Sequence, residues 1–226
     1  MKTQQHWQGE LWLARDFALF AGASGDTSEH AHYAHQLVLA VDAPLRLRLQ
    51  GTPLRGACIC IESMQPHAFV DSQQPLVAVY AEPLAFAADE LRRSLAGVAA
   101  NLPNVAQCMA RVVRREPEPR IAQALAALDQ LLEAKVSAVE LAAEAGVSLS
   151  QLERLFAEQI GLSVRRLVLW RRLRLALALS MQGANLTHAA HAAGFADSAH
   201  LSRTVRSMFG IRADRTLRHL RLRLLD

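Results

Sequence analysis

The chain has 226 residues, of which 51% are apolar and 20% are charged. That balance excludes a disordered chain and is typical of a globular protein. No run of residues approaches the roughly 18 consecutive apolar positions that a membrane-spanning helix needs. The segment Met1–Gln8 lacks the apolar stretch of a signal peptide, so we expect a cytoplasmic protein that has no membrane partner.

Charge is divided unevenly along the chain. Residues 1–100 hold 7 basic and 10 acidic residues, a net charge of −3, whereas residues 101–226 hold 18 basic and 11 acidic residues, a net charge of +7. This asymmetry indicates that only the C-terminal half meets a polyanion. Three cysteines, at positions 58, 60 and 108, argue against a disulfide framework.

Residues 5–90 have the pattern of short strands. Leu45–Leu49 alternates strictly between leucine and arginine, as a half-buried strand does, and Gly51–Pro53 is expected to end it. Further strands are expected at Leu37–Val41, Ala57–Ile61 and Leu76–Tyr80. Several short strands separated by turn residues predict a small β-barrel or sandwich.

The composition changes near residue 84, where alanine, leucine and arginine begin to dominate and favour helix. Leu84–Val98 and Val105–Val113 are predicted helices, separated at Pro103. The charged, proline-bearing stretch Arg114–Pro119 is the predicted boundary between the two halves. Everything beyond it is predicted to be helix with short turns.

The C-terminal half contains an internal repeat, whose copies begin at Leu141 and Ala189. In each copy a small-residue helix, Val139–Ala145 or Leu186–Ala193, precedes a glycine, at position 146 or 194. Small residues let a second helix pack closely, and the glycine is placed where the turn needs a positive φ. This is the pattern of a helix-turn-helix unit, whereas a plain helical bundle would explain the repeat only by chance.

The second helix of each copy has a cap and a buried face. Ser148 and Asp197 are placed to accept backbone N–H groups at the helix start. In the first copy the apolar positions follow helical spacing: Leu152, Leu155, Phe156 and Ile160. The long apolar segment Val164–Met181 lies between the copies. We expect it to form a linker helix that lets two recognition helices reach adjacent major grooves, about 34 Å apart.

The second copy also carries a specific motif. It combines a small-residue stretch ending in Gly-Phe, an acidic cap, a His-Leu-Ser-Arg run and a closing Phe-Gly pair. These residues are Ala190–Gly194, Phe195, Asp197, His200–Arg203, Arg206 and Phe209–Gly210, joined by Arg172, Leu173 and Ala176 in the linker. With this motif, residues 137–219 resemble the DNA-binding domain of the AraC/XylS family of transcription regulators.

The resemblance implies two recognition helices that read double-stranded DNA. Carried over by position, the contacting residues are Ser148, Ser150, Gln151 and Arg154 in the first unit and Ser198, Ala199, His200 and Arg203 in the second. Arginine suits guanine or phosphate, and glutamine suits adenine. The family also implies a homodimer with RNA polymerase as a candidate partner. We expect a transcription activator, although the sequence leaves a repressor equally open, and we expect no enzymatic activity because no nucleophile–base pair or phosphate loop has convincing spacing.

The sequence departs from the family pattern at three places. Ala157-Glu158 replaces two basic residues after the first recognition helix, and Glu153 adds a carboxylate to its outward face. The proline-bearing stretch after the last glycine is replaced by Ile211–Arg215. Because carboxylates repel phosphate, the first unit is expected either to bind weakly or to accept a cytosine amino group. We expect the second unit to carry more of the sequence specificity.

Histidines stand out in the N-terminal half. His30-x-His32-x3-Gln36, followed by Pro66-His67, resembles the cupin pattern, in which such side chains converge inside a small barrel. With His35, these residues form the predicted effector pocket: His30, His32, His35, Gln36 and His67. Glutamine stands where cupins usually carry glutamate, so we favour a polar pocket or structural histidines over a metal ion, and we predict no cofactor.

These observations predict an α+β chain in which a cupin-like β-barrel precedes an all-α domain with two helix-turn-helix units. The predicted domains are a sensor for a small-molecule effector (1–83), a helical linker that could pair two copies (84–119) and an AraC-type DNA-binding domain (120–226). One alternative is a metal-dependent cupin oxygenase or isomerase, against which Gln36 counts. Another is a regulator that has lost DNA binding, which only Glu153 and Glu158 support.

Overall fold

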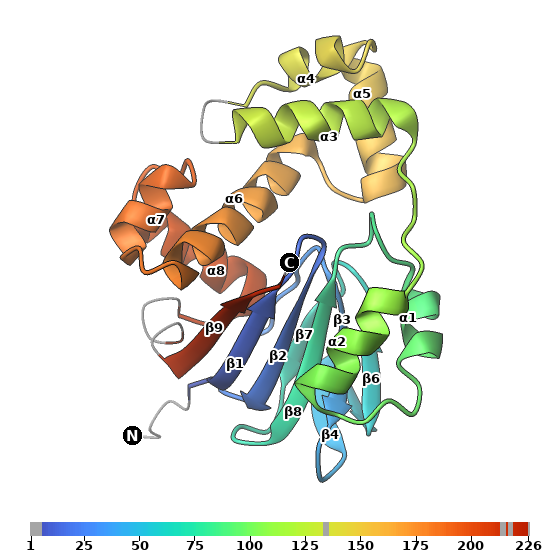
Figure 1. Cartoon of the computed structure of the whole chain (residues 1–226), viewed down its shortest axis with the longest axis vertical. Helices are drawn as coiled ribbons and strands as arrows, with labels where there is room; N and C mark the ends of the chain where they lie inside the picture. The colour runs from blue at the N-terminus through green and yellow to red at the C-terminus, as the bar shows by residue number, and fades with distance from the viewer. Residues whose placement is uncertain (1–5, 133–135, 213–215, 217–218, 226) are drawn as a thin grey trace. The chain divides into compact units, whose positions relative to one another are not determined.

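The computed structural model describes residues 6–132, 136–212, 216 and 219–225 (Figure 1). The chain divides into two compact units. One comprises Met1–Arg115 together with Val205–Asp226, and the other comprises Glu116–Thr204. Among the described residues, no helix is both long enough and apolar enough to cross a membrane.

The first unit contains two sheets. The six-stranded sheet has the order β6-β3-β8-β2-β1-β9, and the three-stranded sheet has the order β5-β4-β7. The strands are β1 (Gln8–Leu13), β2 (Phe17–Ala23), β3 (His35–Ala40), β4 (Leu45–Leu49), β5 (Thr52–Gly56), β6 (Cys58–Ile61), β7 (His67–Phe69), β8 (Pro75–Ala81) and β9 (Leu220–Leu224).

The central strands are buried on both faces, which explains their nearly continuous apolar sequence. Leu37 on β3 and Val79 on β8 pack against the two helices α1 (Ala88–Ser94) and α2 (Leu102–Arg111). Val38, next to Leu37 on β3, and Ala78, next to Val79 on β8, pack instead in a second core that includes residues of β4. Successive side chains of a strand point to opposite faces, so one sheet separates a helix-facing core from a core between the sheets.

The described strands form two separate sheets. Of the barrel and the sandwich that the sequence left open, the structure has the sandwich, which helices cover on one side. The expected end of the strand Leu45–Leu49 is confirmed, because β4 stops at Leu49. Gln50 and Gly51 form a tight turn with positive φ, and Pro53 lies inside β5. Because β5 is an edge strand, a proline there removes no ladder hydrogen bond that the sheet requires.

Pro103 does not separate the two helices as expected. It lies in the first turn of α2, where Asn101 caps the helix by accepting the N–H of Asn104. Proline is favoured at this position because the first helical N–H groups have no partner within the helix. The first helix comprises only Ala88–Ser94, and residues 95–100 form a turn and an irregular loop before α2.

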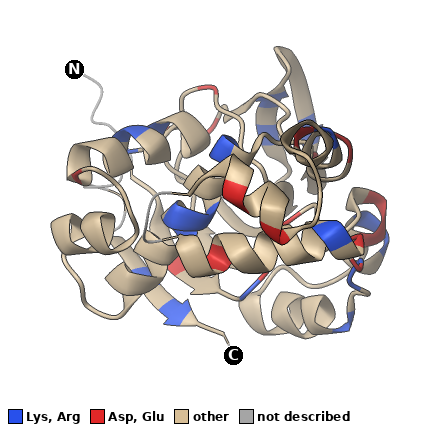
Figure 2. Ribbon diagram, turned by 90° about the horizontal axis from the view of Figure 1, so that it is seen from above, with Lys and Arg blue, Asp and Glu red and all other residues tan. Residues whose placement is uncertain are grey.

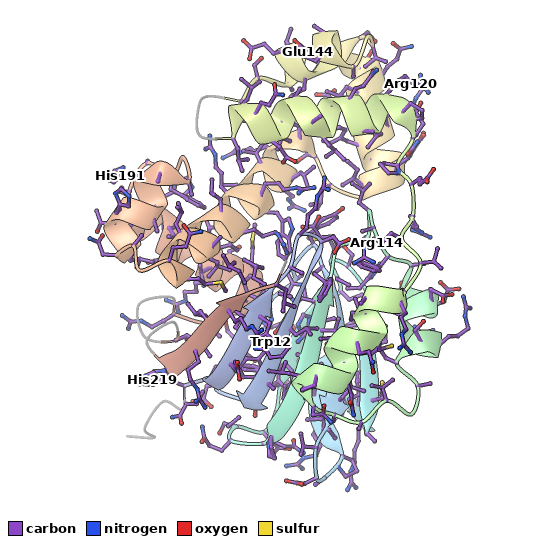
Figure 3. All side chains as sticks on the ribbon, viewed as in Figure 1. Trp12, Arg114, Arg120, Glu144, His191 and His219 are labelled. Atoms are coloured by element: carbon purple, nitrogen blue, oxygen red, sulfur yellow. The ribbon has the colours of Figure 1, made fainter. Side chains whose placement is uncertain are left out.

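The C-terminal tail was expected to be helical, but Leu220–Leu224 forms β9, which pairs in parallel with β1. Its alternation of leucine and arginine is the same as that of β4, and strand formation follows from that alternation. The guanidinium of Arg223 lies 4.9 Å from the ring centre of Trp12 on β1, which Figure 3 labels. The N–H of Leu225 donates to the Leu13 carbonyl at 2.8 Å.

The second unit is helical (Figure 1). Its helices are α3 (Pro119–Leu131), α4 (Ala138–Glu144), α5 (Leu149–Leu155), the π-helical turn η1 (Phe156–Ile160), α6 (Val164–Met181), α7 (Leu186–Ala192) and α8 (Ser198–Phe209), whose last residues, from Val205 on, belong to the first unit. The predicted linker helix is confirmed as α6, and the four apolar residues predicted for the first recognition helix are all buried.

Candidate functional site

Both helix-turn-helix units have the turn geometry that their sequences predict. Gly146 has φ +63° and Gly194 has φ +78°, in the left-handed region that favours glycine. A Cβ at Gly194 would also lie 2.8 Å from the guanidinium carbon of Arg172 and 2.9 Å from the Leu132 carbonyl oxygen, whereas the space around Gly146 is open. Gly194 is thus constrained by its neighbours as well as by its backbone.

Both predicted helix caps are confirmed. The hydroxyl of Ser148 accepts the backbone N–H of Gln151, and the side-chain oxygen Oε1 of Gln151 accepts the backbone N–H of Ser148 at 2.9 Å, a complete capping box. In the second unit the Asp197 carboxylate accepts the N–H of His200. These caps fix the first turn of α5 and of α8, the turns next to the predicted contact residues.

The predicted contact residues of the first unit, Ser148, Ser150, Gln151 and Arg154, are all exposed. The side chain of Gln151 has two uses. Its oxygen accepts a hydrogen bond in the cap, while its NH₂ group is the part that would donate to a base. Glu153 and Glu158 are exposed beside these residues, as the sequence indicated.

In the second unit Ala199 and Arg203 are exposed, and Ser198 and His200 are partly buried. The His200 ring lies edge-on to Phe195, with ring centres 5.2 Å apart, so His200 also packs against the turn. Figure 2 shows basic and acidic residues interspersed along the ribbon.

Arg172, from the motif in the linker helix, has a structural role. Its Nε–H donates to the carbonyl of Leu132 at the end of α3, at 3.0 Å. Burial lowers the pKa of its guanidinium. The side chain thereby joins α3, α6 and the turn at Gly194.

Four of the five residues predicted for the effector pocket come together in the first unit. His30 and His67 exchange backbone hydrogen bonds, and their ring centres are 4.2 Å apart. His32 lies beside them, 5.1 Å from His67. The Gln36 carbonyl oxygen lies 3.2 Å from Nε2 of His32. All four side chains are buried.

His35 does not join this cluster. Like Leu37 and Leu39, it occupies an odd position of β3, and those two leucines face the helices. Its Nδ1 accepts the N–H of Ser63 at 3.0 Å. Burial lowers the pKa of His35 to about 4; Glu62 opposes this shift and Arg115 adds to it. The prediction that His35 lines the pocket is wrong, because adjacent residues of a strand point to opposite faces.

The hydrogen bonds of the three clustered histidines fix which ring nitrogen carries the proton. Each Nδ1 lies 2.8–3.0 Å from a backbone carbonyl oxygen, which can only accept. Each Nδ1 is therefore the protonated nitrogen, and each Nε2 carries a lone pair. Burial keeps the rings neutral: with help from His67, it lowers the pKa of His30 to about 4 and, with help from His67 and His30, that of His32 to about 3.

The cluster suits a transition-metal ion. One ring nitrogen from each of His30, His32 and His67 lies within 4.8 Å of the others. Nε2 of His67 is buried and has no hydrogen-bond partner among the described residues. Tetrahedral zinc holds imidazole nitrogens about 3.3 Å apart, so modest side-chain rotations would bring the three into range. The residues thus fit the metal that the cupin resemblance implies.

The sequence did not single out three further residues around the cluster. The Tyr80 hydroxyl accepts a hydrogen bond from the Gln36 amide at 3.1 Å, and burial raises the pKa of Tyr80. The Phe209 ring centre lies 5.2 Å from that of His32. The Gly210 carbonyl accepts the N–H of Ser28 at 3.2 Å. The pairing of Gln36 with Tyr80 on β3 and β8 could have revealed Tyr80, but no local signal points to Phe209 or Gly210.

Comparisons with known proteins agree with this architecture. Residues 141–219 match the protein family described as "Helix-turn-helix domain". A solved transcriptional regulator with an AraC-type DNA-binding domain, from Chromobacterium violaceum, is 31% identical, and the match covers 39% of this chain and 80% of that one, with a TM-score of 0.38. Among curated proteins, none matches the chain.

Two solved structures of ToxT from Vibrio cholerae are similar over most of the chain. Apo ToxT K231A has a TM-score of 0.59 at 9% identity and covers 88% of this chain and 96% of that one. ToxT bound to an unsaturated fatty acid also has a TM-score of 0.59, at 10% identity, and covers 94% and 95%. At this identity the likeness concerns the fold. In this chain a β-rich domain is followed in sequence by two helix-turn-helix units. The chain belongs to the AraC-type family of DNA-binding transcription regulators.

Proposed function

We propose that this regulator reads a specific DNA sequence mainly through its second helix-turn-helix unit. The observation that carries the proposal is the pair of capped recognition helices, one of which exposes Arg203 without an acidic neighbour on the same turn. In the first unit Arg154 follows Glu153 directly, and that carboxylate repels phosphate. Ser148, Ser150, Gln151, Ser198, Ala199 and His200 complete the proposed contacts.

The effector site of this proposal is the buried cluster of His30, His32, Gln36 and His67. A ToxT structure of the same fold holds an unsaturated fatty acid. In this protein the enclosed groups are imidazoles and an amide, which offer lone pairs on nitrogen and oxygen. An effector that is an electron-pair acceptor therefore suits the site better than an apolar fatty-acid tail does. We assign the site a sensing role because the same chain carries the helix-turn-helix domain of a DNA-binding regulator.

The proposal includes a cytoplasmic homodimer that recruits RNA polymerase. Residues 1–83 would form the sensor, 84–119 a pairing element and 120–226 the DNA-binding domain. The apolar residues of α1 and α2 already pack on their own sheet, so pairing would use the outer, polar faces of these helices.

The test is duplex selection by the full chain from a randomised DNA library, followed by affinity measurements on the selected duplex and a scrambled duplex at two salt concentrations. The proposal predicts at least 1,000-fold preference for the selected duplex, and a steep fall in affinity with salt for both. Arg203→Ala should bind the selected duplex more weakly. Arg120→Ala is its charge-matched control, since Arg120 lies on α3 and pairs with Glu118. Equal binding to both duplexes would contradict the proposal.

A further inference from the structure

The histidine cluster and the end of the second recognition helix belong to the same compact unit. The unit includes Val205–Asp226, hence the last residues of α8. Phe209 is the final residue of α8 and Gly210 follows it. We propose that a divalent transition metal ion is the effector of the cluster, and that Phe209 and Gly210 link its binding to the recognition helix. This inference rests on the proposed function.

The first step is the need for a cation among the enclosed nitrogens and oxygens. His32 lies between two oxygen atoms, since its Nδ1 is 3.0 Å from the Ala34 carbonyl oxygen and its Nε2 is 3.2 Å from the side-chain oxygen of Gln36. Nε2 of His67 is buried nearby and has no hydrogen-bond partner among the described residues. A metal ion accepts the lone pairs of both side chains at once.

The second step concerns what orients the ligands. The Nδ1–H of each clustered histidine donates to a backbone carbonyl, and such outer bonds hold the ring of a metal ligand in place. The Gln36 side chain, held by the Tyr80 hydroxyl at 3.1 Å, brings a fourth donor oxygen beside His32. Three imidazoles and one oxygen are a donor set that zinc, cobalt and nickel accept.

The third step is the contact with α8. The Phe209 ring packs at 5.2 Å from His32 and at 5.9 Å from Tyr80, measured between ring centres. Gly210 packs closely against Ser28 and His30. A Cβ added to Gly210 would lie 2.4 Å from the Ser28 carbonyl oxygen and 2.9 Å from Nδ1 of His30. The same Ser28 carbonyl accepts the Nδ1–H of His30. Both His30 and His32 thus have a direct neighbour at the end of α8.

These contacts link metal binding at the histidine cluster to the helix α8 that is proposed to read DNA. Drawing three nitrogens together around an ion rotates the rings of His30 and His32, and it changes the surface on which Phe209 and Gly210 rest. If metal binding alters the affinity for DNA by some factor, DNA must alter the affinity for the metal by the same factor. Arg203 lies six residues before Phe209 on the same helix, so a change at the helix end acts on the element that carries the proposed DNA-reading residue.

The experiment uses the full chain with Co²⁺ or Zn²⁺ alone as the probe. Metal binding is followed through the visible absorption of Co²⁺, and hydrogen exchange is followed at the amides of residues 205–210. Wild type should bind one ion and exchange these amides at least fivefold more slowly with metal. His67→Asn should weaken metal binding at least tenfold. Phe209→Ala should keep the ion but lose the exchange effect, while Phe209→Leu restores part of it.

Ser207→Ala is the control, because Ser207 is exposed on the same turn of α8 and should behave as wild type. With the selected duplex, metal should change DNA affinity at least fivefold, and DNA should change metal affinity equally. A chain that selects DNA but binds neither ion would overturn this inference and leave the proposed function standing. A chain that binds the ion without any change at residues 205–210 would overturn the linkage. A chain that selects no duplex would overturn the proposed function, and hydrogen exchange would still decide the linkage.

Discussion

The Nε–H of Arg172 donates to the carbonyl of Leu132, and the turn glycine Gly194 packs against both groups. A motif arginine of the linker helix therefore holds the end of α3 and the turn of the second unit together. Arg172 is thus a point where three elements of the helical unit meet.

This contact predicts different costs for the same substitution in the two turns. Gly194→Ala should lower the free energy of unfolding by about 3 kcal/mol, since left-handed strain of about 1–2 kcal/mol is joined by displacement of Arg172. Gly146→Ala, with no neighbour near its Cβ, should show the strain alone. Urea denaturation of both variants checks this, and equal losses would refute the role of Arg172.

Gln151 allows the helix cap to be separated from DNA reading. Gln151→Glu keeps an acceptor at the third helical position and adds a negative charge near the helix N-terminus, so stability should stay the same or rise by up to about 1 kcal/mol. The same change removes the amide donor, so affinity for the selected duplex should fall about tenfold or more. Denaturation and DNA titration of one variant give both values. Unchanged DNA affinity would exclude Gln151 from the interface.

Acid should destabilise the first unit through His35. Its pKa is about 4 in the folded state and about 6.5 when unfolded, so the unfolded chain binds more protons between these values. The stability it contributes is complete above pH 6.5 and is lost as the pH falls towards 4, by at most about 3 kcal/mol. His35→Asn retains an acceptor for the Ser63 N–H but does not titrate. Its unfolding free energy should depend less on pH, and parallel curves would contradict the argument.

Strand β9 should protect the edge of β1. Removing residues 219–226 exposes the backbone groups of β1 that pair with β9, and an open strand edge promotes association. The shortened chain should melt several degrees lower and elute at a larger size on gel filtration. Arg223→Ala, which leaves the strand but removes the contact with Trp12, should cost only about 0.5–1 kcal/mol. A shortened chain that melts with wild type would show that β9 contributes nothing.

The sequence predicted those elements whose signals are local. Helix α6 has the predicted bounds because its apolar spacing lies within the segment, and Ser148 and Asp197 cap because capping needs only the next turn. Strand β9 was missed because its partner β1 lies at the opposite end of the chain. Its alternation was visible but was outweighed by the helical composition around it.

The candidate site was predictable to the same extent. His30, His32, Gln36 and His67 were recognisable by spacing, and strand periodicity alone would have set His35 apart from Gln36. Phe209 and Gly210 already had an explanation as the end of a helix-turn-helix motif. Their contacts with His32 and His30 are tertiary contacts between segments far apart in the sequence, and no residue spacing predicts such contacts.

The central claim, that the second helix-turn-helix unit dominates sequence reading, is tested most directly by comparing Arg203→Ala with Arg154→Ala on the selected duplex and on single-base variants of it. Both residues are exposed arginines at matching positions of the repeat. We predict that Arg203→Ala loses about 1–3 kcal/mol and relaxes the preference at one base pair, whereas Arg154→Ala loses less and leaves the preference intact. An equal or larger loss for Arg154→Ala, or no loss for Arg203→Ala, would contradict the account.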